Sequence, residues 1–129
     1  MSEKRESLAL VVEDDEDLSV IFSEALRAAG FKTKIAQAGD VALEMLAETI
    51  PGVVVLDLHL PRVAGMDILH EIRADERLAD TRVIVATAHP RMAENLRDEA
   101  DLVLLKPISF SQLRDLAALL DTARSTKSA

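Results

Sequence analysis

The stretch VVEDDED places five consecutive carboxylates, Glu13 to Asp17, directly after an apolar segment. Like charges at this spacing repel one another, so the run is either a solvated helix start or part of a site that a cation neutralises. A further carboxylate, Asp57, is the only charged residue in VVVLDLHL, where burial is costly without a partner. Thr87 follows the apolar run VIVA, and Lys106 follows LVLL.

These residue types suit phosphoryl transfer. Carboxylates without a soft ligand favour a hard divalent cation such as Mg²⁺, and a carboxylate beside that cation can attack a phosphoryl group to form an aspartyl phosphate. A lysine and a hydroxyl donor would stabilise the phosphoryl oxygens. The sequence has no GxxxxGKS loop, no GxGxxG motif and no serine elbow, so the sites that these motifs build are not indicated.

The acidic run has a simpler explanation over part of its length. Acidic residues ahead of a helix act as caps and as partners of the helix dipole, and we favour that interpretation for Asp15 to Asp17. Glu13 and Asp14 come first after the apolar run, so they are the pair we expect to bind the cation.

The other groups also have structural explanations when each is taken alone. Asp57 and Lys106 could form a structural salt bridge, and Thr87 by itself is an ordinary strand residue. Their placement after separate apolar runs, together with the acidic pair, is what favours a functional site.

Short apolar runs rich in β-branched residues predict the strands that carry these groups. Continuous apolar runs of this length are typical of strands that are covered on both faces. The predicted strands span residues 8–12, 33–36, 53–58, 83–87 and 102–105, with 33–36 the weakest of them.

Segments with helical spacing lie between the strands. Apolar residues over 18–29 follow the i, i+3, i+4, i+7 pattern, and Gly30 is placed to end that helix. The other predicted helices span residues 41–48, 66–73, 91–99 and 113–120.

Strands and helices alternate along the whole chain, which predicts an α/β fold: a single doubly wound (βα)5 domain with a five-stranded parallel sheet. The domain would span 1–129, with a core over about 7–123 and flexible ends at 1–6 and 124–129. Ligands of such sheets bind outside the carboxyl ends of the strands. The chemical groups described above all follow strand ends, so they are expected to converge there.

Composition narrows the class of protein. The 129 residues are 49% hydrophobic and 29% charged, an ordinary globular balance. A net charge of −8 and only three aromatic residues argue against direct binding to nucleic acid. The chain has no cysteine, no apolar run long enough to span a membrane and no signal-peptide pattern in MSEKRES. A soluble, cytoplasmic protein is therefore expected.

Four segments carry a family resemblance: LALVVEDDEDL, VVVLDLHLPRVAGMDILHEIR, VIVATA and LVLLKPISF. In that order, and over essentially the whole chain, they resemble the receiver domain of bacterial two-component response regulators, of the CheY-like, stand-alone type. The resemblance implies a flavodoxin-like, CheY-like fold. Pro61 and Gly65 match the loop before the third helix, where Gly65 is expected to supply unusual backbone freedom.

The resemblance also implies roles in phosphorylation. Asp57 would be the phosphoacceptor, and Thr87 would bond the phosphoryl group and move inward as the switch. Lys106 would pair with a phosphoryl oxygen. The bond from Lys106 to Pro107 resembles the usual cis peptide of the family.

By the same resemblance, the chain would bind Mg²⁺ through residues on two strand ends. Asp14 would ligate the ion directly and Glu13 through water. Asp57 would add its carboxylate, and His59 would add its backbone carbonyl. No other cofactor is implied.

Two features depart from the family pattern. Val103 stands where active receivers commonly have Tyr or Phe, three residues before the lysine, so the usual threonine-to-aromatic relay cannot operate. Thr87 and Lys106 are also closer in sequence than usual, by about one helical turn, and the loss is expected near 91–99. Output is therefore expected to use another surface, or a reshaped form of the family's usual output face, which the fourth helix, the fifth strand and the last helix form.

The three histidines have different predicted environments. His70 is expected to be a solvated residue of the third helix. His59 and His89 each lie two residues after a predicted site residue, and they either tune access of the hydrolytic water or are exposed rim residues.

The function that these observations favour is a phosphoacceptor switch of a two-component phosphorelay. It would accept a phosphoryl group from a sensor histidine kinase or phosphotransfer protein and change its affinity for a protein partner. It would be a signalling module rather than a metabolic enzyme, with no direct nucleic acid or membrane partner, and the last helix permits a homodimer.

Two alternatives stay open from sequence. A docking module of receiver fold would work without phosphorylation, which the missing aromatic residue mildly favours. A phosphohydrolase with an aspartyl nucleophile usually has a second catalytic carboxylate two residues later, where this chain has His59.

Overall fold

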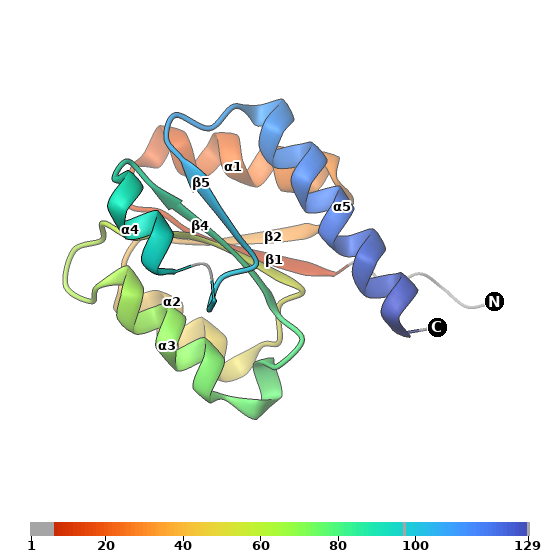
Figure 1. The fold of residues 1–129 in the computed structure, drawn as a ribbon, viewed down its shortest axis with the longest axis horizontal. Helices are drawn as coiled ribbons and strands as arrows, with labels where there is room; N and C mark the ends of the chain where they lie inside the picture. Colours follow the sequence, from red (N-terminus) through yellow and green to blue (C-terminus); the bar gives the residue numbers. More distant parts are fainter. Residues whose placement is uncertain (1–6, 97, 129) are drawn as a thin grey trace.

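The computed structural model describes residues 7–96 and 98–128, which form a five-stranded parallel sheet flanked by helices (Figure 1). The strand order is β2-β1-β3-β4-β5, a doubly wound, flavodoxin-like arrangement that confirms the predicted fold. The strands are β1 (Leu8–Val12), β2 (Lys32–Ala36), β3 (Val53–Asp57), β4 (Arg82–Thr87) and β5 (Leu102–Leu105).

The helices alternate with the strands as predicted, and within the described residues none is long and apolar enough to cross a membrane. The sequence pattern missed a short 3₁₀ helix, η1 (Glu76–Leu78), which begins where the Asp75 carboxylate accepts the Arg77 N–H at 3.0 Å. The α-helices are α1 (Glu16–Ala28), α2 (Gly39–Glu48), α3 (Gly65–Ala74), α4 (Pro90–Asn95) and α5 (Phe110–Ser128).

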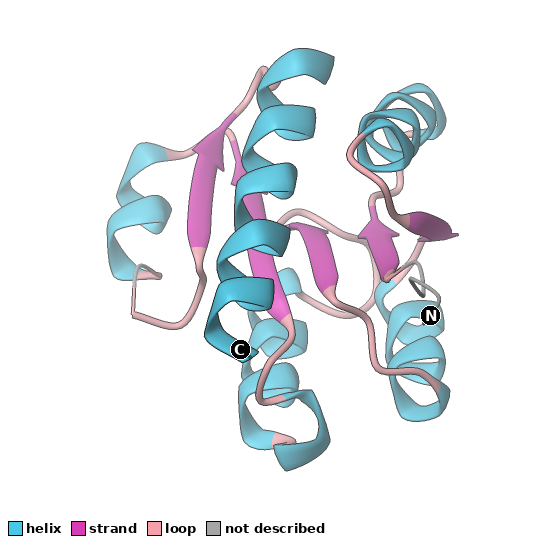
Figure 2. Ribbon diagram, turned by 90° about the vertical axis from the view of Figure 1, so that its right-hand side faces the viewer, coloured by secondary structure: helices cyan, strands magenta, loops and turns pink. Residues whose placement is uncertain are grey.

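Helices cover the sheet on both faces (Figure 2), so the central strands are buried on both sides. Every residue of β3 is buried, whereas β2 alternates exposed and half-buried residues at its edge of the sheet. Because β3 is covered on both faces and β2 lies at an edge, the sequence of β3 is a nearly continuous apolar run, whereas that of β2 includes polar residues. One apolar core lies under α1 and α5 and includes Phe22, Leu26 and Leu113; the other lies under α2 and α3 and includes Leu46, Ile68 and Leu96.

The boundaries of α1 follow the capping residues in the sequence. The Asp15 carboxylate accepts the backbone N–H of Leu18 at 2.9 Å, so Asp15 is the N-cap, and Glu16 and Asp17 lie in the first turn. Gly30 has a φ of 103° directly after the helix, a conformation that favours glycine. The interpretation of residues 15–17 as a helix start is therefore confirmed.

Gly65 is required for a reason that differs from the predicted one. Its φ is not positive; Arg62 takes the left-handed conformation in this loop, with a φ of 69°. A Cβ on Gly65 would lie 2.6 Å from the carbonyl oxygen of Asp57 and 2.6 Å from the Cα of Leu58. The prediction of unusual backbone freedom is wrong, and glycine is needed because α3 starts against the backbone of the β3 end.

The connection between α4 and β5 is short and is tied to α3. Helix α4 ends at Asn95, four residues earlier than predicted, and a turn follows in which the N–H groups of Glu99 and Ala100 both donate to the Leu96 carbonyl. Arg73 of α3 donates to the Glu99 carbonyl at 2.6 Å and to the Asp101 carboxylate at 2.9 Å. These bonds hold the turn in place.

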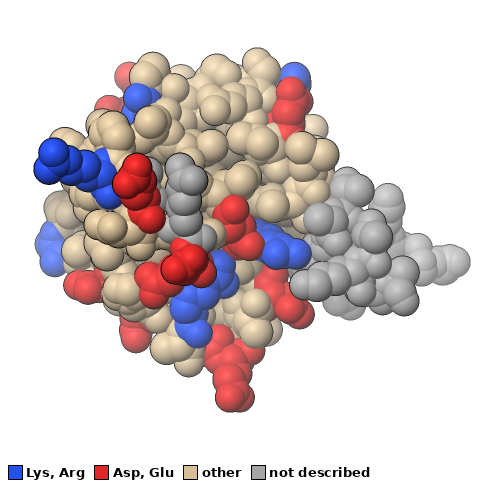
Figure 3. Space-filling model, in the orientation of Figure 1, with Lys and Arg blue, Asp and Glu red and all other residues tan. Residues whose placement is uncertain are grey.

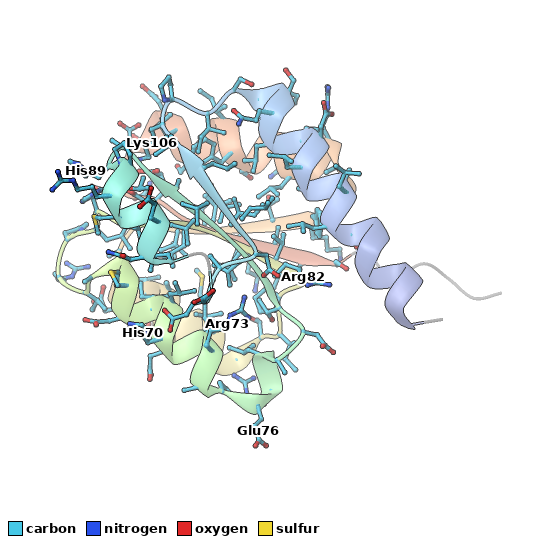
Figure 4. All side chains as sticks on the ribbon, in the orientation of Figure 1. His70, Arg73, Glu76, Arg82, His89 and Lys106 are labelled. Atoms are coloured by element: carbon cyan, nitrogen blue, oxygen red, sulfur yellow. The ribbon has the colours of Figure 1, made fainter. Side chains whose placement is uncertain are left out.

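Further polar contacts extend this network at the start of β4 and β5, and charged side chains gather on the lower part of the face in Figure 3. The Asp101 carboxylate accepts the Val83 N–H at 2.7 Å and the Arg82 guanidinium at 3.1 Å. His70 remains 52% exposed, but its Nδ1 lies 2.9 Å from a Glu99 carboxylate oxygen, so it is partnered rather than merely solvated (Figure 4).

The ends of the chain bear on the predicted domain boundaries. Residues 1–6, one of the two ends predicted to be flexible, lie outside the described residues, as does Ala129, the last residue of the other predicted end, 124–129. Helix α5 continues through Ser128, beyond the predicted core boundary at 123.

Replacing Gly65 by alanine should destabilise the domain. The added Cβ would meet backbone atoms that cannot rotate away, so the free energy of unfolding should fall by about 1–3 kcal/mol. Urea denaturation measures this fall. Ala64→Ser is the control, because it adds an atom at the exposed N-cap position next door; equal effects of the two substitutions would contradict the explanation.

Candidate functional site

Three carboxylates converge at the carboxyl edge of the sheet. Glu13 and Asp14 directly follow β1, and Asp57 is the last residue of β3, the strand that pairs with β1. One carboxylate oxygen from each residue lies within 4.8 Å of the other two. Glu13 is 2% exposed and Asp57 is 3% exposed, whereas Asp14 is open to solvent. The sheet edge therefore holds a cluster of three carboxylates, Glu13, Asp14 and Asp57, which is open to solvent at Asp14 and is called the carboxylate pocket below.

Lys106, directly after β5, brings the ammonium group to this pocket. Its Nζ lies 3.3 Å from a carboxylate oxygen of Glu13 and 3.3 Å from one of Asp57. The backbone N–H of Lys106 donates to the Thr87 carbonyl at 2.9 Å, which fixes the base of the side chain against β4. The Lys106–Pro107 peptide is cis, as the resemblance implied.

Thr87 and His59 lie beside the pocket through the ends of β4 and β3. Thr87 is fully buried, and its Oγ1 accepts the backbone N–H of His89 at 3.1 Å. The backbone N–H of His59 donates to an Asp57 carboxylate oxygen at 3.1 Å. All six residues predicted for the site thus come from the ends of four strands that meet at one edge.

The pocket contains more negative than positive charge. Burial raises the pKa of Glu13 from 4.5 to about 7; the backbone N–H of Asp15 acts in the opposite direction, and the charge of Asp57 adds to the increase. Burial lowers the pKa of Lys106, but the charges of Asp57 and Glu13 outweigh burial, so that the pKa is raised overall. One ammonium faces three carboxylates, and a divalent cation would relieve the remaining repulsion.

The donor set fits a hard cation. The three converging side chains offer only carboxylate oxygens, the ligands of Mg²⁺ and related ions. The exposed Asp14 leaves a side from which an ion and its waters can enter. The buried Glu13, whose pKa is raised toward neutrality, is the group that would gain most from a positive charge nearby.

The histidines of the rim lie against each other. The rings of His59 and His89 are 4.9 Å apart between centroids and meet edge to face. Both side chains are exposed. This pairing was not foreseen from sequence, although the identical spacing of each histidine after a site residue was the available signal.

The region that departs from the family pattern is also built differently. Val103 is half-buried and packs against the core under α2 and α3. The ties from Arg73 and Asp101 to the turn after α4 were not predicted; an acidic residue directly before β5 was the only hint. A small apolar residue, Val103, thus lies in β5, and the ion pair of Arg73 with Asp101 lies at the start of that strand.

The stability of the metal-free protein should depend on the ionisation of Glu13. Because the pKa of Glu13 is raised from 4.5 in the unfolded chain to about 7 in the fold, the folded state retains a proton between these values. The contribution of Glu13 to the free energy of unfolding is therefore fully present below pH 4.5, and it is lost as the pH rises to 7. The fall should be on the order of 3 kcal/mol.

Urea denaturation in the presence of a chelator measures this dependence across pH 4.5 to 8. Glu13→Gln removes the ionisation, so its stability should decline less over that window. Asp17→Asn, a substitution in the exposed first turn of α1, is the control and should follow the parent protein. Identical pH dependence of the Glu13 variant and the parent would contradict the raised pKa.

Comparison with known proteins agrees with this architecture. The family model of the response regulator receiver domain matches residues 9–118. The regulatory protein LuxO of Vibrio vulnificus is 32% identical over 107 residues, covering 81% of this chain and 23% of LuxO. The DNA-binding response regulator MtrA of Mycobacterium leprae is 33% identical over 104 residues, covering 81% of this chain and 46% of MtrA.

Solved structures give the same result. A signal receiver domain from Vibrio parahaemolyticus superimposes with a TM-score of 0.87 at 28% identity, covering 96% of each chain. This chain spans less than half the length of the two regulators named above. The protein belongs to the receiver domain family of two-component response regulators.

Proposed function

We propose that this receiver domain is a Mg²⁺-dependent phosphoacceptor switch, with Asp57 accepting a phosphoryl group from a sensor histidine kinase or phosphotransfer protein. The observation that supports the proposal most directly is the convergence of the Glu13, Asp14 and Asp57 carboxylates within 4.8 Å of one another. Lys106 completes the set, 3.3 Å from two of them.

Asp57 would act as the nucleophile. One of its oxygens contacts the Lys106 ammonium and the His59 N–H, and these donors orient the carboxylate. As a carboxylate oxygen forms a bond to phosphorus, the bond from phosphorus to the donor's histidine nitrogen breaks, and the imidazole leaves as the neutral ring after protonation. The product is an aspartyl phosphate.

Asp14, Glu13, Asp57 and the His59 carbonyl would hold the cation, which when bound would neutralise negative charge on the phosphoryl oxygens. Lys106 would exchange its contact with Asp57 for one with a phosphoryl oxygen and stabilise the charge there. Glu13 keeps Lys106 at the pocket through the 3.3 Å ion pair.

Thr87 is the candidate for the conformational switch. Its hydroxyl is buried and accepts the His89 N–H, and its own proton would be donated toward a phosphoryl group that arrives at Asp57. That new bond would favour one packing of the β4–α4 segment over another and so shift the population between two states. A partner that binds the two states unequally would read the change.

The conformational change at Thr87 would reach the output surface without an aromatic relay. Val103 is half-buried against the core under α2 and α3, so a side-chain rotation of the usual kind is not available at this position. The turn after α4 is tied to α3 through Arg73. Movement of the β4–α4 segment would therefore reach α3 as well as β5, and the output surface would include α3.

Phosphorylation of Asp57 can be tested with acetyl phosphate and Mg²⁺. Intact mass should show a single phosphoryl adduct, which should be lost in Asp57→Asn and retained in Asp67→Asn, an exposed acid in the first turn of α3. Absence of any adduct in the parent would instead favour a docking module that works without phosphorylation. Rapid turnover of many phosphoesters would favour a hydrolase.

Binding of Mg²⁺ should raise the melting temperature. An ion at one hundred times its dissociation constant stabilises the fold by about 2.7 kcal/mol. Asp14→Asn should remove most of this gain, because Asp14 is the exposed ligand of the three. Asp17→Asn, three residues further along the same acidic run, should keep it. An equal Mg²⁺ response in both variants would place the ion elsewhere.

A further inference from the structure

His59 and His89 form a pair that the proposed phosphorylation chemistry does not use as side chains. Their rings lie 4.9 Å apart between centroids, with an interplanar angle of 70°. Both side chains are exposed, and they come from different loops, one after β3 and one after β4. The pair stands at the rim of the pocket, where Figure 4 labels His89.

The fold holds the backbones of these two histidines through hydrogen bonds of the same kind. The N–H of His59 donates to the Asp57 carboxylate at 3.1 Å, and the N–H of His89 donates to the Thr87 hydroxyl at 3.1 Å. Strands β3 and β4 are paired in parallel just before these loops. Each histidine follows its anchor by two residues, so the pairing of the strands keeps the two imidazoles adjacent.

The spacing of the rings suits a shared metal ion. Two imidazoles on one tetrahedral ion, with metal–nitrogen bonds of about 2.0–2.1 Å, have ring centres about 5 Å apart, close to the separation seen between His59 and His89. Because both side chains are exposed, the rings can turn from their edge-to-face contact until one nitrogen of each points at the ion. Imidazole nitrogen prefers Zn²⁺, Co²⁺, Ni²⁺ and Cu²⁺, whereas the neighbouring carboxylates prefer hard ions. Two sites of different chemistry therefore stand side by side.

We propose that His59 and His89 together bind a divalent transition-metal ion such as Zn²⁺, at a site separate from the carboxylate pocket. Among the described residues, the one group of three or more converging metal-ligating side chains is Glu13, Asp14 and Asp57. The histidine pair thus supplies two ligands and leaves the other positions of the ion to water or to a group from solution.

An ion at this site would link the loop after Asp57 to the loop after Thr87. The two loops border the pocket, so the link would restrict entry of a phosphodonor. Zn²⁺ is therefore expected to slow the reaction of Asp57 with acetyl phosphate at least severalfold. This consequence rests on the proposed function, whereas binding of the ion does not.

Calorimetric titration with Zn²⁺, in excess Mg²⁺ to occupy the carboxylate pocket, tests the binding. The parent should bind one equivalent. His59→Ala and His89→Ala should each raise the dissociation constant at least tenfold. His70→Ala is the matched control, because His70 is the third histidine of a chain without cysteine and lies on α3 beside Glu99; it should bind as the parent does.

The outcomes separate this proposal from the phosphoacceptor function. Zn²⁺ binding that survives either rim substitution, or that is lost in Asp57→Asn, would overturn the histidine site. Slowing of phosphorylation that is equal in the parent and in His89→Ala would show that Zn²⁺ acts at the carboxylates, which also contradicts it. Failure of phosphorylation without Zn²⁺ would count against the proposed function alone and would leave the Zn²⁺ titration as the test of this site.

Discussion

The repulsion among three carboxylates at one sheet edge is the constraint on which the rest of the site depends. Glu13 and Asp57 are almost fully buried, and Asp14 lies within reach of both. Such a group is costly unless cations stand beside it, and Lys106 supplies one positive charge to two of the three. Burial, with an added contribution from the charge of Asp57, raises the pKa of Glu13. A cation bound at this edge, as proposed above, would reduce the repulsion.

Apolar burial in the parallel sheet offsets the unfavourable free energy of holding these charges together. Strand β3 is buried along its whole length, and its neighbours β1 and β4 contribute to both apolar cores. Burial of that apolar surface is the main favourable contribution to folding. Because the strands are parallel, their carboxyl ends meet at one edge, and the buried strands of the sheet bring the like charges together there.

Much of this architecture was predictable because the relevant physics is local. The apolar runs identified the strands, and Asp15 and Gly30 marked the ends of α1 through capping that depends on a few neighbouring residues. The extent of α4 was not predictable, since the turn after Asn95 is held by Arg73 from another helix. The role of Gly65 was misjudged for the same reason: the atoms that exclude a side chain belong to the end of β3.

The sequence by itself determined the alternation of strands and helices and the residue types that end each strand, because periodicity and composition act along the chain. Only the tertiary structure decided which of those residues touch. It pairs Lys106 with both Glu13 and Asp57, although the sequence suggested Asp57 alone. It also brings His59 and His89 into contact. Such contacts depend on strand order and register, which join residues that are distant in the chain.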